Sequence, residues 1–385
     1  MNDFDFDAPI DRHQTASLKW DKYGDRDILP LWVADMDFRS SPAVVQALEK
    51  RVEHGVFGYG VPPRKITGII CEMLARRYSW QVEAEHLVWL PGLVCGLNLA
   101  CRAVGREQDE VVTLVPIYPP FLTAPGNSGR RLVTVPLAVE NNRWIIDFEV
   151  LEKSITPKTR LLLFCNPHNP VGRVFSRKEI GRLVSLCLSH KITICSDEIH
   201  CDLILDADKK HFPTATLSSE AAACTITLMA PSKTFNIPGL GCSFAVIGNR
   251  QLRQKFVRAM TGIVPDVNIF GYTAAEAAYR DGWQWLEALL DYLRQNRKIV
   301  EETIAATAGL HMCPVEATYL AWIDARRIDP VSPGLFFETY GIGLSEGSEF
   351  GTPGFVRLNF GCRRALLHEA LKRMEKAVKA KQELS

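Results

Sequence analysis

The strongest constraint on the fold is a repeated alternation between short apolar runs and helix-like segments. Between several runs lie patterns such as Arg177–His190, where apolar residues recur every three or four positions. Strands that alternate with helices form a mostly parallel sheet covered on both faces. The sequence therefore predicts an α/β fold with a mostly parallel seven-stranded sheet. The seven runs are His86–Leu90, Glu110–Val115, Arg131–Leu137, Arg160–Cys165, Ile192–Ser196, Cys224–Met229 and Cys242–Gly248.

The pattern changes after about Gly282. A long helical stretch begins at Trp283, and it leads into a second group of short strands and a closing helix. We expect a large domain over residues 46–282 and a smaller α+β domain built from residues 1–45 and 283–385. The first 45 residues should pack against the smaller unit or across the active site. The segments of the second group are Tyr319–Ile323, a strand near Ile342, Phe355–Asn359 and a helix over Arg364–Lys379.

The composition argues against several classes of partner. Of the 385 residues 47% are hydrophobic, and 45 basic residues nearly balance 44 acidic ones, so the net charge is +1. Such a balance favours neither nucleic acid nor an anionic membrane surface. The acidic start, "MNDFDFDAPIDRHQ", lacks the apolar core of a signal peptide, and no apolar run reaches the ~18 residues of a membrane span. We expect no nucleic acid and no membrane as partners.

The cysteines indicate a reducing compartment. There are 11 of them, an odd number, and none forms a C-x-x-C pair. Several lie inside apolar runs, as Cys165, Cys195, Cys224 and Cys242 do, which is typical of small buried hydrophobes. The expectation is a cytoplasmic protein without disulfides and without a metal site.

Three polar residues follow three of the predicted strands. Asn169 lies in "NPHNPVG", Asp197 opens "DEIH", and Lys233 is the single charge of "APSKTFNIPGL". Each has an ordinary structural interpretation: a turn former, a helix cap and a surface lysine. However, the carboxyl ends of parallel strands share one edge, where ligands bind in open α/β sheets. We therefore expect the three side chains to border one crevice.

A fourth strand end offers a phosphate site. After His86–Leu90 comes a glycine turn, Pro91–Gly96, which opens a helix over Leu97–Val104. The first N–H groups of a helix suit a phosphate. Together these features match pyridoxal phosphate, which needs a lysine amine for its aldehyde, a carboxylate for its pyridine nitrogen and donors for its phenolic oxygen.

Six motifs resemble a known family. Three of them, "NPHNPVG", "SDEIHCDL" and "PSKTFNIPGL", resemble the fold-type I aminotransferases of class I/II. Three more, "LWVADMDF", "GVFGYGVPP" and "GFVRLNFGC", resemble the MalY/PatB-type cystathionine β-lyases, or C–S lyases. The resemblance runs from about Phe4 to about Lys379. It implies the aminotransferase fold with a large cofactor-binding domain, a homodimer with shared active sites, and β-elimination on cystathionine- or cysteine-type amino acids giving pyruvate, ammonia and a thiol.

The same resemblance implies a role for individual residues. Lys233 would bind the cofactor and move the Cα proton, Asp197 would pair with the pyridine nitrogen, and Tyr118 would stack on the ring. Arg357 would clamp the substrate carboxylate. The other implied cofactor contacts are Gly92, Leu93, Val94, Asn169, His200, Ser232 and, from a neighbouring subunit, Tyr59.

The chain departs from the family pattern at three positions. His200 stands where related aminotransferases often carry a tyrosine. Ala230 stands where many relatives place a phosphate-binding serine, which leaves that role to Ser232. Pro119 stands where some members have a second tyrosine, so no proton shuttle is expected from that side chain.

Three alternatives remain open from the sequence. A class I/II aminotransferase would share the fold and the cofactor. A regulatory protein could use the same fold to bind a transcription activator. A DNA-binding regulator would need an additional helix-turn-helix, whereas about 45 residues precede the expected large domain.

Overall fold

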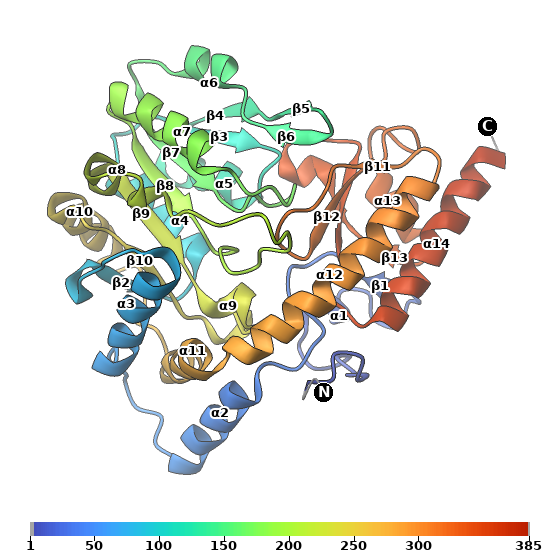
Figure 1. The fold of residues 1–385 in the computed structure, drawn as a ribbon, viewed down its shortest axis with the longest axis horizontal. Helices are drawn as coiled ribbons and strands as arrows, with labels where there is room; N and C mark the ends of the chain where they lie inside the picture. The colour runs from blue at the N-terminus through green and yellow to red at the C-terminus, as the bar shows by residue number, and fades with distance from the viewer. Residues whose placement is uncertain (1–3, 384–385) are drawn as a thin grey trace.

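A seven-stranded sheet dominates the computed structural model, which describes residues 4–383 (Figure 1). The strand order is β2-β10-β9-β8-β7-β3-β4. Strand β10 alone runs opposite to the other six strands of this sheet. The predicted mostly parallel seven-stranded sheet is therefore confirmed. Its strands are β2 (Leu87–Leu90), β3 (Glu110–Val115), β4 (Arg131–Pro136), β7 (Thr159–Cys165), β8 (Thr193–Asp197), β9 (Thr225–Met229) and β10 (Ser243–Val246).

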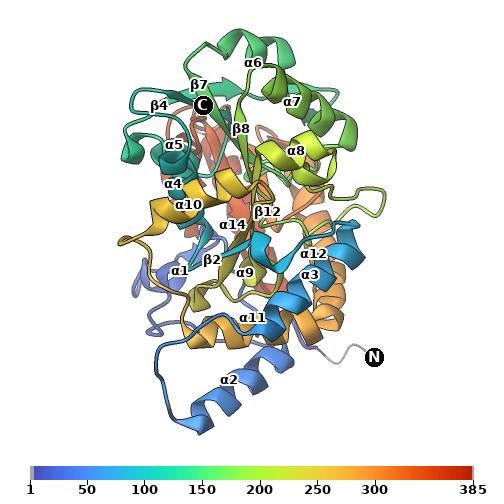
Figure 2. The same cartoon turned by 90° about the vertical axis from the view of Figure 1, so that its left-hand side faces the viewer.

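Helices cover both faces of this sheet because its strands alternate their side chains. In β7, Leu161 and Leu163 pack in one core with α4 (Leu93–Ala103) and α10 (Arg250–Met260). The intervening Leu162 and Phe164 pack in another core with α6 (Phe148–Ser154) and α7 (Arg177–Ser189). Consecutive side chains of the strand therefore face the helix layers on opposite sides of the sheet. Figure 2 shows β8 between α4 on one side and α7 on the other.

A second, four-stranded sheet lies beside the first, with the order β11-β12-β15-β14. Two long helices, α12 (Trp283–Ala306) and α14 (Arg364–Glu383), pack against it and against each other (Figure 1). The expected strands near Tyr319 and Phe355 are present as β12 and β15. The strands are β11 (His311–Met312), β12 (Leu320–Asp324), β14 (Ser345–Glu346) and β15 (Phe355–Asn359).

The N-terminal residues join this second unit and also reach the site. Strand β1 (Leu29–Pro30) pairs in parallel with β13 (Ile342–Gly343), so the expected strand near Ile342 lies outside the four-stranded sheet. The segment that follows β1 reaches the turn after β9, where Lys233 donates to the Ala34 carbonyl. The remaining α-helices and strands are α1 (Leu18–Asp21), α2 (Pro42–His54), α3 (Arg64–Tyr78), α5 (Pro120–Thr123), α8 (Ser219–Cys224), α9 (Pro231–Thr234), α11 (Ile269–Asp281), α13 (Pro333–Glu338) and the hairpin strands β5 (Ala138–Glu140) and β6 (Arg143–Ile145).

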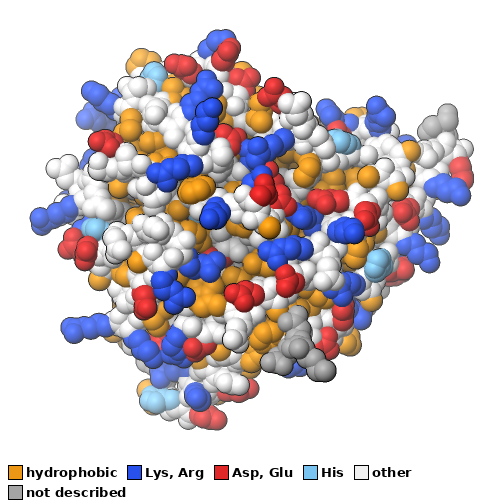
Figure 3. Space-filling view, in the orientation of Figure 1, with side chains coloured by type: hydrophobic (Ala, Val, Ile, Leu, Met, Phe, Trp, Pro, Cys, Tyr) orange, Lys and Arg blue, Asp and Glu red, His pale blue; other side chains and the backbone are white. Residues whose placement is uncertain are grey.

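Basic and acidic side chains are interspersed on the face shown in Figure 3, so no large region of this face carries charges of one sign only. Across residues 4–383, no helix has the length and apolar character needed to span a bilayer. All eleven cysteines have free thiols. Within the same residues no cluster of His, Cys, Asp and Glu has the arrangement of a metal site.

Candidate active site

The carboxyl ends of the parallel strands open into one cavity of about 1000 Å³. Asn169, Asp197 and Lys233, which follow or end β7, β8 and β9, all line it. The structure therefore brings together the three residues that the sequence places at one edge. The other expected site residues in the wall are Gly92, Leu93, Val94, Tyr118, His200, Ser232 and Arg357.

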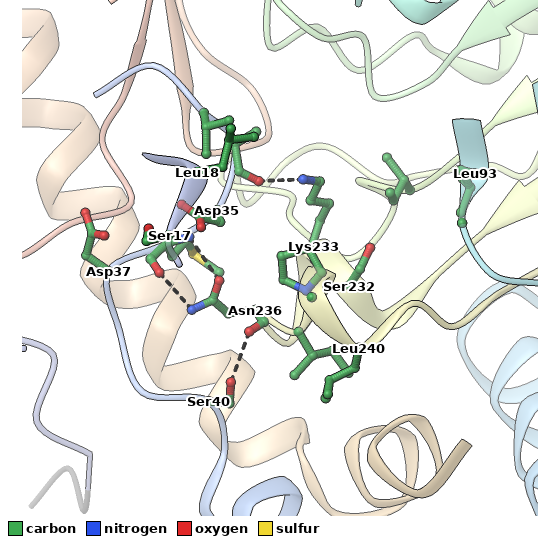
Figure 4. A pocket seen from close by; sticks show the side chains of 18 of the residues that line it. Ser17, Leu18, Asp35, Asp37, Ser40, Leu93, Ser232, Lys233, Asn236 and Leu240 are labelled. Carbon is green, nitrogen blue, oxygen red and sulfur yellow. Dashed lines mark hydrogen bonds between the residues drawn. The ribbon is translucent and has the colours of Figure 1, made fainter. Parts of the chain in front are cut away.

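Lys233 lies on α9, a single helical turn that the sequence did not predict. Pro231 opens this turn at a position where its missing N–H costs nothing. The Lys233 side chain is only partly exposed, so it is not an ordinary surface lysine. Its Nζ donates to the carbonyl oxygen of Ala34 at 2.5 Å (Figure 4). Burial, and then the charge of Arg357, lower the pKa of Lys233 to about 8.

Asp197 and His200 are both buried on the floor of the cavity. The Asp197 carboxylate accepts from the backbone N–H of Ile199 at 3.1 Å. Burial outweighs this bond and raises the pKa of Asp197 to about 7. Burial, together with the charges of Lys233 and Arg357, lowers the pKa of His200 to about 3, so its ring is neutral. The Nδ1 atom of His200 is buried without a partner in the described structure.

The N-terminus of α4 forms the part of the wall that the sequence predicts as a phosphate site. Its N-cap is Gly92, and no side chain caps the helix. The first N–H groups of a helix lack partners within the helix, so those of Leu93 and Val94 are available at the wall. Gly96 lets α4 approach β9 closely, because a Cβ at this position would lie 2.9 Å from Leu228.

Arg357 enters the cavity from β15 of the second sheet and is buried. One terminal nitrogen donates to Asn169 Oδ1 at 3.1 Å, and the other donates to the Trp32 carbonyl at 2.8 Å. Burial lowers the pKa of Arg357 to about 10, so the group stays cationic at neutral pH. Its Nε has no partner within residues 4–383. A buried guanidinium with an unused donor suits a carboxylate.

Two expected cofactor contacts differ in their placement. Tyr118, just beyond β3, is partly exposed at the cavity, and burial raises the pKa of its hydroxyl. Tyr59 does not line the cavity. It lies in the coil between α2 and α3, and its side chain is fully exposed.

The sequence analysis missed several residues of the cavity. Arg12 forms ion pairs with Asp35 at 2.7 Å and Asp37 at 2.6 Å, and all three line the wall. Asn236, three positions after Lys233, also lines it. The motif "LWVADMDF" contained a signal for the two aspartates, since charged residues recur there within an apolar run. No local pattern singled out Arg12 or Asn236.

Comparison with known proteins places this geometry in a family. Residues 26–374 match the model of the family described as "Aminotransferase class I and II". The chain therefore belongs to that family, and its large sheet is the aminotransferase class I/II fold.

Individual relatives cover nearly the whole chain. It is 38% identical to cystathionine β-lyase PatB of Bacillus subtilis (strain 168) over 97% of this chain and 99% of that protein. The crystal structure of OvoB superposes with a TM-score of 0.95 at 48% identity, covering 97% of this chain and 99% of the other. The crystal structure of cystalysin from Treponema denticola, which contains pyridoxal 5'-phosphate, gives a TM-score of 0.93 at 31% identity over 98% and 99% of the two chains.

Proposed function

We propose that this chain is a pyridoxal phosphate-dependent C–S lyase that acts on cystathionine- or cysteine-type amino acids. The observation that carries the proposal is the convergence of Lys233, Asp197 and the uncapped N-terminus of α4 on one cavity. PatB, which is named a cystathionine β-lyase, supports the reaction class.

The residues present fit the cofactor. The free N–H groups of Leu93 and Val94, with the Ser232 hydroxyl, would hold the phosphate. Asp197 would face the pyridine nitrogen, and Tyr118 would stack on the ring. The unpartnered Nδ1 of His200 is the kind of buried polar atom that a ligand satisfies.

Asn169 and Tyr59 complete the proposed contacts. Asn169 would donate through its amide nitrogen to the phenolic oxygen, because its Oδ1 already accepts from Arg357. Tyr59 would reach the phosphate from a neighbouring subunit.

The bound cofactor supplies an electron sink for negative charge that develops at the substrate Cα. Arg357 binds the substrate carboxylate and thereby orients the Cα–H bond. Lys233 takes the Cα proton, which its amine can do because a pKa of about 8 leaves a neutral fraction near neutral pH. The Cβ–S bond then breaks and the thiolate leaves. Water completes the conversion of the remaining carbon skeleton to pyruvate and ammonia.

A cytoplasmic homodimer with shared active sites belongs to the same proposal. The coil between α2 and α3 exposes several apolar side chains in succession: Val56, Phe57, Tyr59 and Val61. Phe57 packs on Phe270 of α11 with ring centroids 5.6 Å apart, which anchors the coil at its base. A run of exposed apolar side chains is typical of a protein interface. We also propose the domain division at residues 45/46 and 282/283.

The test of this proposal is Lys233→Ala, with the exposed Lys255→Ala as its control. The purified wild-type protein should show the visible absorbance of a lysine-bound cofactor, and borohydride should fix the cofactor to the chain. Lys233→Ala should lose both signals and nearly all turnover, whereas Lys255→Ala should keep them. If Lys233→Ala retains a borohydride-fixed cofactor, another lysine is the anchor and the site assignment fails.

A further inference from the structure

Asn236 links the lysine turn to the N-terminal wall, by which we mean residues 32–38. Its Oδ1 accepts from the backbone N–H of Met36 at 2.9 Å. Its Nδ2 donates to the carbonyls of Met36 at 3.0 Å and Phe38 at 2.9 Å. Ser40 in turn donates to the Asn236 carbonyl at 3.0 Å. In Figure 4, Asn236 lies between Lys233 and Ser40.

The conformation of Asn236 suits this role. Its φ is +54°, a left-handed conformation that asparagine tolerates better than most residues with a side chain. This backbone conformation places the side chain against the N-terminal wall, where one amide forms three hydrogen bonds. A residue without a side-chain amide would lose these bonds.

The same wall is held from the second sheet. Asn359, at the end of β15, donates from its Nδ2 to the carbonyls of Val33 at 2.6 Å and Asp35 at 2.7 Å. Arg357, on the same strand, donates to the carbonyl of Trp32. Side chains of β15 therefore hold the first part of the wall, from Trp32 to Asp35, and Asn236 holds Met36 and Phe38.

Ala34 lies between Val33 and Asp35, which Asn359 holds, and two positions before Met36, which Asn236 holds. Ala34 lines the cavity. Its carbonyl oxygen accepts from Lys233 Nζ at 2.5 Å and from the Tyr319 hydroxyl at 2.9 Å. Tyr319 is buried and its ring lies edge-on to His200. The Lys233 amine thus has a fixed acceptor whenever it is not bonded to another group.

We infer that Asn236 is a positioning residue: it fixes the N-terminal wall to the lysine turn, so that the Ala34 carbonyl holds the Lys233 amine whenever substrate has displaced it. Held there, the amine keeps one orientation while it moves the Cα proton. This inference rests on the proposed role of Lys233. Asn236 would thus position the amine for proton transfer, and it would not bind substrate or cofactor.

The experiment compares Asn236→Gly with Asn141→Gly. Glycine keeps the left-handed backbone but removes the three side-chain bonds, whereas Asn141 has φ +51° in the exposed β5–β6 turn and serves as the matched control. In Asn236→Gly, kcat should fall roughly ten- to a hundredfold, as expected for a misplaced reacting group, while KM stays within about twofold. The isotope effect of Cα-deuterated substrate on kcat should increase. Asn141→Gly should match the wild type.

Cofactor-free protein provides a second readout. The midpoint of the pH dependence of pyridoxal phosphate capture should move to lower pH in Asn236→Gly, because the ammonium form of Lys233 loses its acceptor. The Met36 amide, which donates to Asn236, should exchange its hydrogen faster. Asn236→Asp keeps the acceptor for Met36 but loses both donations, and it decides the matter if the glycine variant does not fold.

Three results would overturn the inference. One is unchanged kcat with an unchanged capture midpoint. Another is a loss confined to KM. The third is a loss of kcat that simply follows a lowered thermal midpoint. Failure of the proposed function is distinguishable, because the wild-type protein would then lack a cofactor bound through Lys233, whereas failure of this inference alone leaves that linkage intact in every Asn236 variant.

Discussion

Asp197 and Lys233 face one cavity from the carboxyl ends of β8 and β9, which are neighbouring parallel strands. Each charge favours the charged form of the other, yet burial outweighs this attraction in both groups. The pKa of Asp197 rises to about 7 and that of Lys233 falls to about 8. The cofactor-free site therefore titrates near neutral pH, which gives two predictions.

The rate at which cofactor-free protein captures pyridoxal phosphate should depend on the protonation of Lys233. Only the neutral amine attacks an aldehyde, and a lowered pKa makes it available at lower pH than an ordinary lysine. The rate should rise with pH, reach half its maximum near the pKa of about 8, and level off about one pH unit above that. Stopped-flow absorbance measures it, with N-acetyl-lysine as the reference amine. A protein rate that follows the reference amine toward pH 10 would contradict the lowered pKa.

Asp197→Asn should stabilise the cofactor-free protein while abolishing catalysis. The folded-state pKa of Asp197, about 7, lies above its usual value of 3.8, so the folded state binds an extra proton between these limits. Stability is therefore lost as pH rises through that window, and the full cost is present above about pH 7. At pH 8 the asparagine variant, still able to accept from Ile199, should be more stable by on the order of 1–3 kcal/mol.

Urea unfolding at pH 8 and at pH 4 checks this prediction. The difference between wild type and Asp197→Asn should be largest at pH 8 and should shrink toward pH 4. Asp208→Asn, an exposed change, is the control and should show no such gain. Equal stability of Asp197→Asn and wild type at pH 8 would mean that burial of the ionised Asp197 carboxylate does not destabilise the folded protein.

Mixed subunits should reveal whether Tyr59 serves a neighbouring site. Lys233→Ala and Tyr59→Ala chains, each nearly inactive alone, should regain part of the activity when they exchange, because one site of a mixed dimer would carry both native residues. The control is Val139→Ala, which changes another exposed apolar residue. A mixture of Val139→Ala and Lys233→Ala chains should have no more activity than the Val139→Ala chains have alone. The measurement is turnover after exchange, with subunit mixing followed by native mass spectrometry. No gain despite proven mixing would mean that each site is built within one chain.

The architecture of the large sheet could be predicted because its signals are local. Each apolar run has the length of a strand, and the helices between them impose parallel neighbours. The reversed direction of β10 was not predictable, since Ser243–Val246 is equally apolar read either way. The pairing of β1 with β13 escaped prediction too, because strands of two residues carry no periodicity.

The residues of the candidate site likewise divide into those that the sequence could predict and those that it could not. Asn169, Asp197 and Lys233 follow strands, so the topology of the sheet places them together. Asn236 was missed because its partner Met36 lies 200 positions earlier in the chain. Backbone groups accept and donate in every residue, so nothing in the sequence marks Met36 as the partner of an asparagine.

The sequence motifs and the cavity leave one chemical choice to experiment, lyase against aminotransferase. Both reactions begin when Lys233 takes the proton from the substrate Cα. A lyase then expels the Cβ substituent and needs no second substrate. An aminotransferase instead keeps the substrate amino group and requires a keto acid to accept it before the next turnover.

Cystathionine alone should therefore be consumed over many turnovers, with pyruvate, ammonia and homocysteine released in equal amounts. Arg357→Lys should raise KM and also lower kcat, since a lysine cannot make the two-pronged contact that binds the carboxylate and orients the Cα–H bond. Coupled assays for pyruvate and for free thiol measure both products, and added keto acid should not accelerate either. If the reaction stops after one equivalent per site and resumes only when a keto acid is supplied, the chain is an aminotransferase. Both the lyase assignment and the proposed cysteine-type substrates would then be wrong.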